Sequence, residues 1–290
     1  MWNSSMVWAV EPHRFQAFLS SVYRREAASG ANAASGTSVP TGGGVAVIPI
    51  RGIILKDAGW LEAYGAVSLR KVEDALLAAS SDPGVSKIVM LIDSPGGSVD
   101  GLYGTAQIMR QVNKTKPIVA VVDGLAASAG YYLASQATEI TAGKMDEVGS
   151  IGVRVLLYDF SKLFTDAGVR PVLIDTGEFK SIGAMGVPIS EAQQAEVRKI
   201  VDAFFADFKA SVRKGRSMTE PQVNKVADGR VFLGEEAREL GLIDRVQSAR
   251  DAVAGVLAGI AKPRLRVAEM SPVVFGNGQG KHLTRSGGKQ

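Results

Sequence analysis

The sequence has no cysteine and only two histidines among its 290 residues, and aromatic residues make up 7% of it. A chain without cysteine has no disulfide scaffold, no thiolate nucleophile and no cysteine-ligated zinc. No apolar stretch approaches the roughly 18 residues that a membrane span needs, and the N-terminus lacks the basic start and apolar core of a signal peptide. We therefore expect a soluble protein that does not contact a membrane.

The charge is uneven along the chain. The net charge is +4, and residues 262–290 contribute much of it, because Glu269 is the only acid in this stretch. A basic tail without interleaved aromatic residues or a nucleic-acid motif does not indicate specific binding of DNA or RNA. We expect no specific nucleic-acid partner.

Composition divides the chain into three parts. Residues 1–44 are expected to form an N-terminal segment, with a short amphipathic helix over 11–26 and a flexible Gly-, Ala-, Ser- and Thr-rich linker over 27–44. A folded domain is expected over 45–250. Residues 251–290 are expected to hold the end of a helix and a disordered basic tail.

Strands and helices are predicted to alternate through the domain. Apolar runs of strand length lie at 45–50, 87–92, 117–122, 151–158 and 171–175. Continuous apolar runs are typical of strands that are covered on both faces. Helical spacing of apolar residues lies between them, over 68–79 and 102–112. This order predicts an α/β domain with a mostly parallel sheet.

A longer helix is predicted over about 190–214. Ser190 and Gln193 form a capping-box pattern at its start. Its expected core stripe is Val197, Val201, Phe204, Phe208 and Val212. A second capping pattern at 219–222, a short helix ended by Gly241 and a last strand are expected to complete the domain.

Ser128 lies among small residues, between an apolar run and a helical stretch, in "GLAASAGYY". A serine hydroxyl is a weak nucleophile until a base takes its proton, and the usual base is histidine. His13 precedes the linker and His282 lies in the tail, so neither is expected near the domain's site. If Ser128 is a nucleophile, its base should be a lysine. The alternative is that Ser128 only caps a helix.

A lysine base must be neutral, so its pKa has to fall from about 10.4 to about 7 through burial away from carboxylates. Lys180 has the best surroundings for this, because Phe179, Ile182 and other apolar or small residues flank it, although Asp175 and Glu178 are close in sequence. Three other lysines fit less well: Lys56, Lys144 and Lys162. For any single lysine, exposure as a solvated amine is the ordinary alternative.

Acyl transfer also needs donors for the developing oxyanion. The segment 93–101, "DSPGGSVDG", follows a predicted strand and runs into a predicted helix, as Ser128 does. Two such turns at one end of a sheet would bring the Gly97 and Ala129 amides to the Ser128 hydroxyl. The alternative is an ordinary strand-to-helix turn.

The ordered set "DSPGGSVDG", "ASAGYYLAS", "GSIGV" and "GEFKS" resembles the signal peptide peptidase A family of serine proteases. Within that family, the chain is similar to the proteases that tailed bacteriophages use in head maturation. The resemblance covers residues 45–248. It implies a crotonase-like, Clp-protease-like α/β fold with stacked strand and helix units, and peptide hydrolysis by a Ser-Lys dyad.

The resemblance also implies a role for each matched residue. Ser128 matches the nucleophile, Lys180 the general base and Ser150 the serine that orients the lysine amine. Gly97 and Ala129 match the residues whose amides form the oxyanion hole, although the family often has glycine at the second position. No metal or cofactor is implied.

The resemblance implies a homo-oligomer that acts on capsid, portal or scaffold proteins, in the cytoplasm of a bacterial host or inside a phage procapsid. Membrane-resident members carry an N-terminal anchor, which this sequence is not expected to have. Two alternatives on the same fold stay open. One is a crotonase-type enzyme acting on an acyl-CoA, and the other is a capsid assembly protein without catalytic activity.

Overall fold

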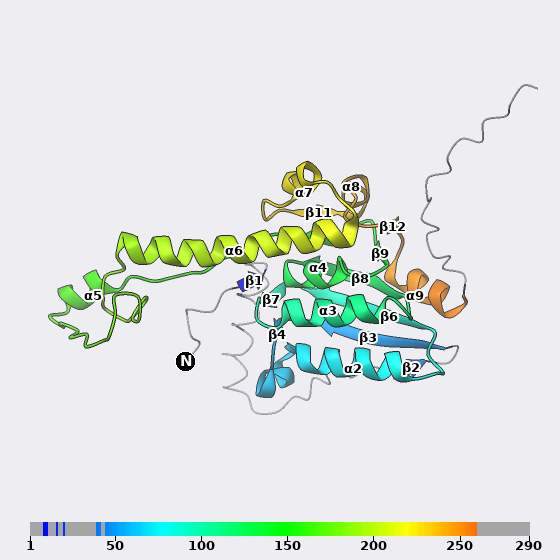
Figure 1. Ribbon diagram of the computed structural model, residues 1–290, viewed down its shortest axis with the longest axis horizontal. Coiled ribbons are helices and arrows are strands. Elements are labelled where there is room, and N and C mark those ends of the chain that lie inside the picture. The colour runs from blue at the N-terminus through cyan, green and yellow to red at the C-terminus, as the bar shows by residue number, and fades with distance from the viewer. Residues whose placement is uncertain (1–7, 11–15, 17–19, 21–38, 42–43, 260–290) are drawn as a thin grey trace, which may run out of the picture.

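A mostly parallel sheet forms the centre of the molecule in the computed structural model, which describes residues 8–10, 16, 20, 39–41 and 44–259 (Figure 1). The sheet has the order β11-β10-β8-β6-β3-β2, and β9 pairs with β8 and β12. Its strands are β2 (Val39–Thr41), β3 (Val45–Arg51), β6 (Lys87–Ser94), β8 (Ile118–Ala127), β9 (Glu139–Ala142), β10 (Glu147–Gly149), β11 (Val231–Leu233) and β12 (Arg245–Val246). The pairs β3–β6, β6–β8 and β8–β10 are parallel, as predicted.

A smaller sheet lies beside one end of the central sheet and has the order β1-β7-β4-β5. Its strands are β1 (Trp8–Val10), β4 (Ile54–Leu55), β5 (Val67–Ser68) and β7 (Gly96–Ser98). The 3-10 helix η1 (Gly59–Tyr64) connects β4 to β5. β7 belongs to the predicted turn 93–101, so this turn pairs with other segments through its backbone.

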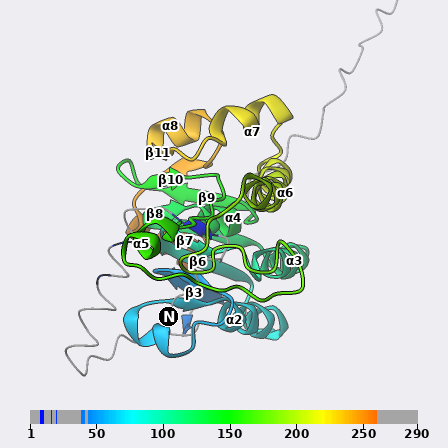
Figure 2. The same ribbon diagram turned by 90° about the vertical axis from the view of Figure 1, so that its left-hand side faces the viewer.

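Helices cover both faces of the central sheet (Figure 2). The helices α2 (Leu69–Ser81) and α3 (Leu102–Val112) pack on one face, and their apolar residues join the main core. On the other face, α9 (Ala249–Leu257) buries Ala252 and Val256 against valines of β6 and β8. Because both faces are covered, β3, β6 and β8 are the continuous apolar runs that the sequence predicts.

A long helix, α6 (Glu191–Arg216), begins with the predicted capping box between Ser190 and Gln193. Only its C-terminal half packs on the domain, since Phe208 and Val212 are buried whereas Phe204 is exposed and Val197 and Val201 are half-buried. The predicted core stripe is therefore correct for the last two turns and wrong for the rest. The short helices α7 (Glu220–Val226) and α8 (Gly234–Glu239) follow it, and Gly241 ends α8 as predicted.

Residues 155–190, which we call the arm, extend from the body beside the N-terminal half of α6 and include α5 (Ser161–Asp166) (Figure 1). None of the arm's apolar side chains is buried, and Ile174 is 92% exposed. The strands predicted at 151–158 and 171–175 are wrong, because these runs extend into the arm and only Arg154 makes a β-bridge. Within the arm, the apolar side chains of these two runs lie on the surface and do not join the core.

The N-terminal segment contributes two strands that the sequence analysis did not predict. β1 pairs with β7, and β2, within the expected linker, forms a hairpin with β3. Most of the helix expected over 11–26 and the whole tail 262–290 lie outside the described residues.

Candidate active site

Ser128 follows the last residue of β8 and immediately precedes the short helix α4 (Ala129–Ala134). Its backbone is at φ 55° and ψ −117°, which is unusual for a residue with a side chain. The Ser128 amide donates a hydrogen bond to the Gly149 carbonyl oxygen at 2.8 Å. The hydroxyl makes no helix-capping hydrogen bond, so capping does not explain this serine. Strain of this kind is common at functional sites.

Ser150 lies beside Ser128 for a simple topological reason. β8 and β10 are parallel neighbours with Ala127 opposite Gly149, so the residue after each strand emerges at the same edge. Ser150 is also at positive φ, 50°, and its amide donates to the Arg230 carbonyl oxygen at 2.6 Å. The two predicted serines are thus brought together by strand register.

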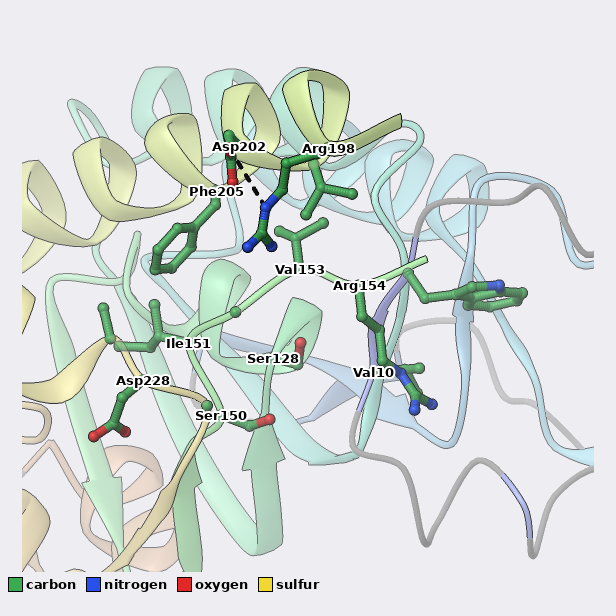
Figure 3. A pocket seen from close by; sticks show the side chains of 15 residues that line it. Val10, Ser128, Ser150, Ile151, Val153, Arg154, Arg198, Asp202, Phe205 and Asp228 are labelled. Carbon is green, nitrogen blue, oxygen red and sulfur yellow. Dashed lines mark ion pairs between the residues drawn. The ribbon is translucent and has the colours of Figure 1, made fainter. Parts of the chain in front are cut away.

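Both serines line a cavity of about 510 Å³, which we call the Ser128 pocket (Figure 3). Neither hydroxyl has a hydrogen-bond partner among the described residues. Ser94 nearby is different, because its Oγ donates to the Gly52 carbonyl oxygen at 2.7 Å. The hydroxyls of Ser128 and Ser150 are therefore free to bond to a group that enters the pocket.

The two predicted oxyanion donors come from adjacent elements. Gly97 is the middle residue of β7, and Ala129 is the first residue of α4, which packs against β7. A Cβ at Gly97 would lie 1.8 Å from the Ile54 carbonyl oxygen, so only glycine fits between β7 and β4. Gly130 similarly allows α4 to approach Ser94 closely.

Buried tyrosines hold α4 in place. The Tyr131 hydroxyl donates to the Leu242 carbonyl oxygen at 2.8 Å. The Tyr132 hydroxyl donates to Asp207 Oδ2 and accepts from the Ser211 hydroxyl, at 3.0 Å each. Burial, with a contribution from the Asp207 carboxylate, raises the pKa of Tyr132 to about 12. Tyr132 thus stays neutral at physiological pH and ties α4, next to Ser128, to α6.

Lys180 does not lie in the Ser128 pocket of its own chain. It is in the arm, exposed, and the described lining of the pocket includes neither lysine nor histidine. The apolar surroundings expected around it are therefore absent in a single chain. Lys56 and Lys162 pair with Asp100 and Asp166 at 3.3 and 2.9 Å, and Lys144 is exposed, so the alternative lysines are also elsewhere.

The pocket also contains charged residues that no sequence motif indicates. Its charged members are Arg154, Arg198, Asp202 and Asp228. Arg198 Nε lies 3.9 Å from Asp202 Oδ2, whereas Arg154 makes no ion pair with the residues described. No sequence motif singled these residues out, although Arg154 directly follows "GSIGV".

Trp8 and Val10 of β1 also line the pocket. The apolar run "VWAV" at 7–10, rich in β-branched and aromatic residues, is the signal in the sequence for this short strand. The partner of this strand, β7, is far along the chain, and no local pattern identifies it.

Within residues 8–10, 16, 20, 39–41 and 44–259, no helix is long and apolar enough to cross a bilayer. The same residues contain no cluster of histidine and carboxylate side chains suited to a metal ion.

Two of the three relatives described here are named as proteases. The chain is 32% identical over 186 residues to a putative protease of Methanocaldococcus jannaschii, covering 63% of this chain and 60% of that protein. It is 30% identical over 214 residues to capsid assembly protease C of Escherichia phage lambda, covering 72% of this chain and 48% of that protein. It is 28% identical over 214 residues to the head-tail preconnector protein GP5 of Enterobacteria phage P21, covering 72% of this chain and 42% of that protein.

The chain thus spans between 42% and 60% of the length of these three relatives. The model of the Clp protease family matches residues 65–143, in agreement with the expected fold. The model of peptidase family S49 matches residues 110–259, which include Ser128, Ser150 and Lys180. With this match over more than half of its residues, the chain belongs to peptidase family S49.

Proposed function

We propose that this protein is a serine endopeptidase in which Ser128 is the nucleophile and Lys180 of a second copy is the general base. The observation that supports this most directly is the pair of hydroxyls of Ser128 and Ser150 at one edge of the Ser128 pocket, which have no hydrogen-bond partner in the described part of the chain. The pocket has room for a further side chain and lacks a base of its own among its described lining residues. A lysine from another chain would complete it.

The arm supports the involvement of a second copy. It carries Lys180 together with exposed apolar side chains, including Val172 at 79% and Ile174 at 92% exposure. Exposed apolar surface of this extent is typical of an interface. Covering the arm with another chain would bury these side chains and deliver Lys180 to a neighbouring pocket.

Burial of the Lys180 amine between two chains would disfavour its ammonium form. Arg154 and Arg198 of the pocket act in the same direction, whereas the Asp202 and Asp228 carboxylates act against it. Each carboxylate already lies near an arginine, Asp202 at 3.9 Å from Arg198 and Asp228 at 2.8 Å from Arg230, which weakens its effect on a further cation. The Ser150 hydroxyl would accept a hydrogen bond from the amine and orient its lone pair toward Ser128.

The proposed reaction has two halves, acylation of Ser128 and hydrolysis of the acyl-enzyme. The Lys180 amine acts as the base in both. Ser128 Oγ attacks the peptide carbonyl carbon while its proton moves to the Lys180 amine, and the Gly97 and Ala129 amides stabilise the oxyanion. The ammonium then protonates the leaving amine nitrogen as the peptide bond breaks. Water, deprotonated by the same lysine, hydrolyses the acyl-enzyme ester and regenerates Ser128.

The substrates we propose are capsid, portal or scaffold proteins of a phage head. The support is the similarity to a capsid assembly protease of phage lambda and to a head-tail preconnector protein of phage P21. Under this proposal the protein acts in the cytoplasm of a bacterial host or inside a procapsid.

The test of the proposed function is covalent labelling followed by a cleavage assay. A fluorophosphonate should modify wild-type protein at Ser128, which peptide mapping identifies, and should not modify Ser128→Ala. Ser81→Ala, an exposed serine on α2, is the matched control and should react as wild type does. Co-expressed capsid, portal and scaffold proteins should be cleaved by wild type and by the control only.

Other outcomes correspond to the alternatives. Turnover of a CoA thioester without peptide cleavage would favour the acyl-CoA enzyme. Failure of Ser128 to react, with no cleavage of any candidate, would favour an assembly protein without catalytic activity.

A further inference from the structure

The strand β1 forms part of the wall of the Ser128 pocket and is paired on both of its edges. On one edge it is antiparallel to β7, with Trp8 opposite Ser98 and Val10 opposite Gly96. On the other edge, the Trp8 amide donates to the Arg154 carbonyl oxygen at 3.0 Å, and the Arg154 amide donates to the Trp8 carbonyl oxygen at 2.9 Å. β1 therefore fills a slot between two segments of backbone.

The two segments that hold β1 also flank the candidate nucleophile. β7 contains Gly97, an expected oxyanion donor, which lies opposite Ala9 in the pairing. Arg154 follows Ser150 by four positions and lines the same pocket (Figure 3). A peptide that presents a bond to Ser128 would run as an extended strand through this slot, because exposed strand edges bind peptides by adding a strand. β1 occupies that path.

The side chains of β1 show what the slot accepts. Trp8 and Val10 are two positions apart, so they lie on the same face of the strand, and both are buried. They form an apolar cluster with Ile53, Leu55, Ala58 and Ala66. The slot therefore accepts apolar side chains at alternate positions of an extended chain.

We propose that residues 8–10 are an internal occupant of the peptide-binding slot, which a substrate segment with apolar side chains at alternate positions must displace. The effect of β1 on catalysis rests on the proposed function. Its occupancy of the slot does not, because it can be measured by peptide binding alone. Because β1 is tethered to the domain, its effective concentration at the slot is high, and a free peptide competes poorly. Peptide bonds in loosely binding segments are thereby protected from Ser128.

The first experiment measures access to Ser128 in the full chain. Trp8→Pro removes the amide that bonds to Arg154 and the indole that fills the cluster. We expect the fluorophosphonate to modify Ser128 in Trp8→Pro roughly tenfold faster or more than in wild type. Adding the peptide VWAVE, the sequence of residues 7–11, should slow the reaction again, and the peptide VPAVE should not.

If β1 has a purely structural role, the variant and the peptide should not affect the rate of Ser128 modification in these directions. In that case Trp8→Pro reacts at the wild-type rate or more slowly, and VWAVE restores or accelerates the reaction. Either result overturns the proposal. Val10→Thr, which keeps the side-chain shape but buries a hydroxyl, is the milder variant in case Trp8→Pro fails to fold. It should change the rate in the same direction by a smaller factor, and an unchanged or lower rate overturns the proposal.

A binding measurement separates this proposal from the proposed function. Fluorescein-labelled VWAVE is titrated into Ser128→Ala and into the double variant Trp8→Pro, Ser128→Ala, and anisotropy is recorded. We expect binding to be roughly tenfold tighter or more in the double variant. An extended peptide of unrelated sequence, with apolar side chains at alternate positions, should compete for the same site.

The binding result holds even if Ser128 reacts in no variant, an outcome that would overturn the proposed function alone. Equal affinity in the two proteins, or no competition by the unrelated peptide, overturns the internal-occupant proposal and leaves the proposed function standing.

Discussion

The amide of Ser128 donates a hydrogen bond to the carbonyl oxygen of Gly149, the residue before Ser150, at 2.8 Å. This bond continues the pairing of β8 and β10 by one residue beyond the strand ends. It fixes both turns together, so the distance between the two candidate catalytic hydroxyls depends on the sheet rather than on a loop. A site built on adjacent parallel strands is rigid before any substrate arrives.

Ser128 is held at positive φ, and replacing it with glycine should relieve that strain. We expect the free energy of unfolding of Ser128→Gly to exceed that of Ser128→Ala by about 1 kcal/mol, because alanine keeps the unfavourable conformation whereas glycine adopts it readily. Both variants should be inactive as peptidases. Urea denaturation measures the difference, and equal stability of the two variants would show that the turn stores no strain.

Tyr132 connects α4 to α6, and its hydroxyl can be removed with little change in shape. Tyr132→Phe should lower the free energy of unfolding by about 1–2 kcal/mol, since the buried Ser211 hydroxyl loses its acceptor and Asp207 loses a donor. Tyr103→Phe, at an exposed tyrosine on α3, is the control and should change stability little. Thermal or chemical denaturation distinguishes them, and similar losses in both would contradict the anchoring role.

Lys180→Arg tests the general base without removing the positive charge. A guanidinium does not deprotonate in proteins, so peptide cleavage should fall by roughly 10²–10⁴-fold. Lys162→Arg, in the same arm and paired with Asp166, should retain the wild-type rate. Near-wild-type cleavage by Lys180→Arg at neutral pH would exclude this lysine as the base.

The arm's apolar surface should be needed for assembly. Ile174 is 92% exposed in the single chain, so the fold should tolerate the charge that Ile174→Asp introduces. The melting temperature of the monomer should be the same with and without the substitution. Light scattering should show loss of the oligomer, and peptide cleavage should be lost with it. Leu77→Asp, at an exposed leucine on α2, should leave the assembled mass and the activity unchanged. An Ile174→Asp protein with wild-type mass would argue against an interface through the arm.

The central sheet could be predicted from the sequence because its strands are covered on both faces. Runs such as 87–92 and 117–122 are apolar without interruption for that reason, and they are β6 and β8 in the structure. The predictions at 151–158 and 171–175 used the same pattern and were wrong. An apolar run looks the same in a sequence whether it packs in a core or remains exposed in the arm.

The site was predictable in part, through the order of its motifs. Ser128 and Ser150 directly follow the parallel strands β8 and β10. Gly97 and Ala129 come shortly after the ends of β6 and β8, and parallel strands bring these ends to one edge of the sheet. The placement of Lys180 could not be predicted from the sequence. The residues around a lysine are similar whether its segment packs onto the domain or extends from it as an arm. β1 was missed because strand pairing across roughly 90 positions leaves no local pattern.

Mixing two inactive variants tests the shared site most directly. Ser128→Ala supplies an intact Lys180, and Lys180→Arg supplies an intact Ser128, so a site between copies is restored when the two variants are neighbours. After dissociation and reassembly as a mixture, we expect peptide cleavage to return at on the order of one site in four, whereas each variant alone stays inactive. A mixture that remains as inactive as its components, although it assembles with the wild-type mass, would contradict a Ser-Lys dyad formed between two chains.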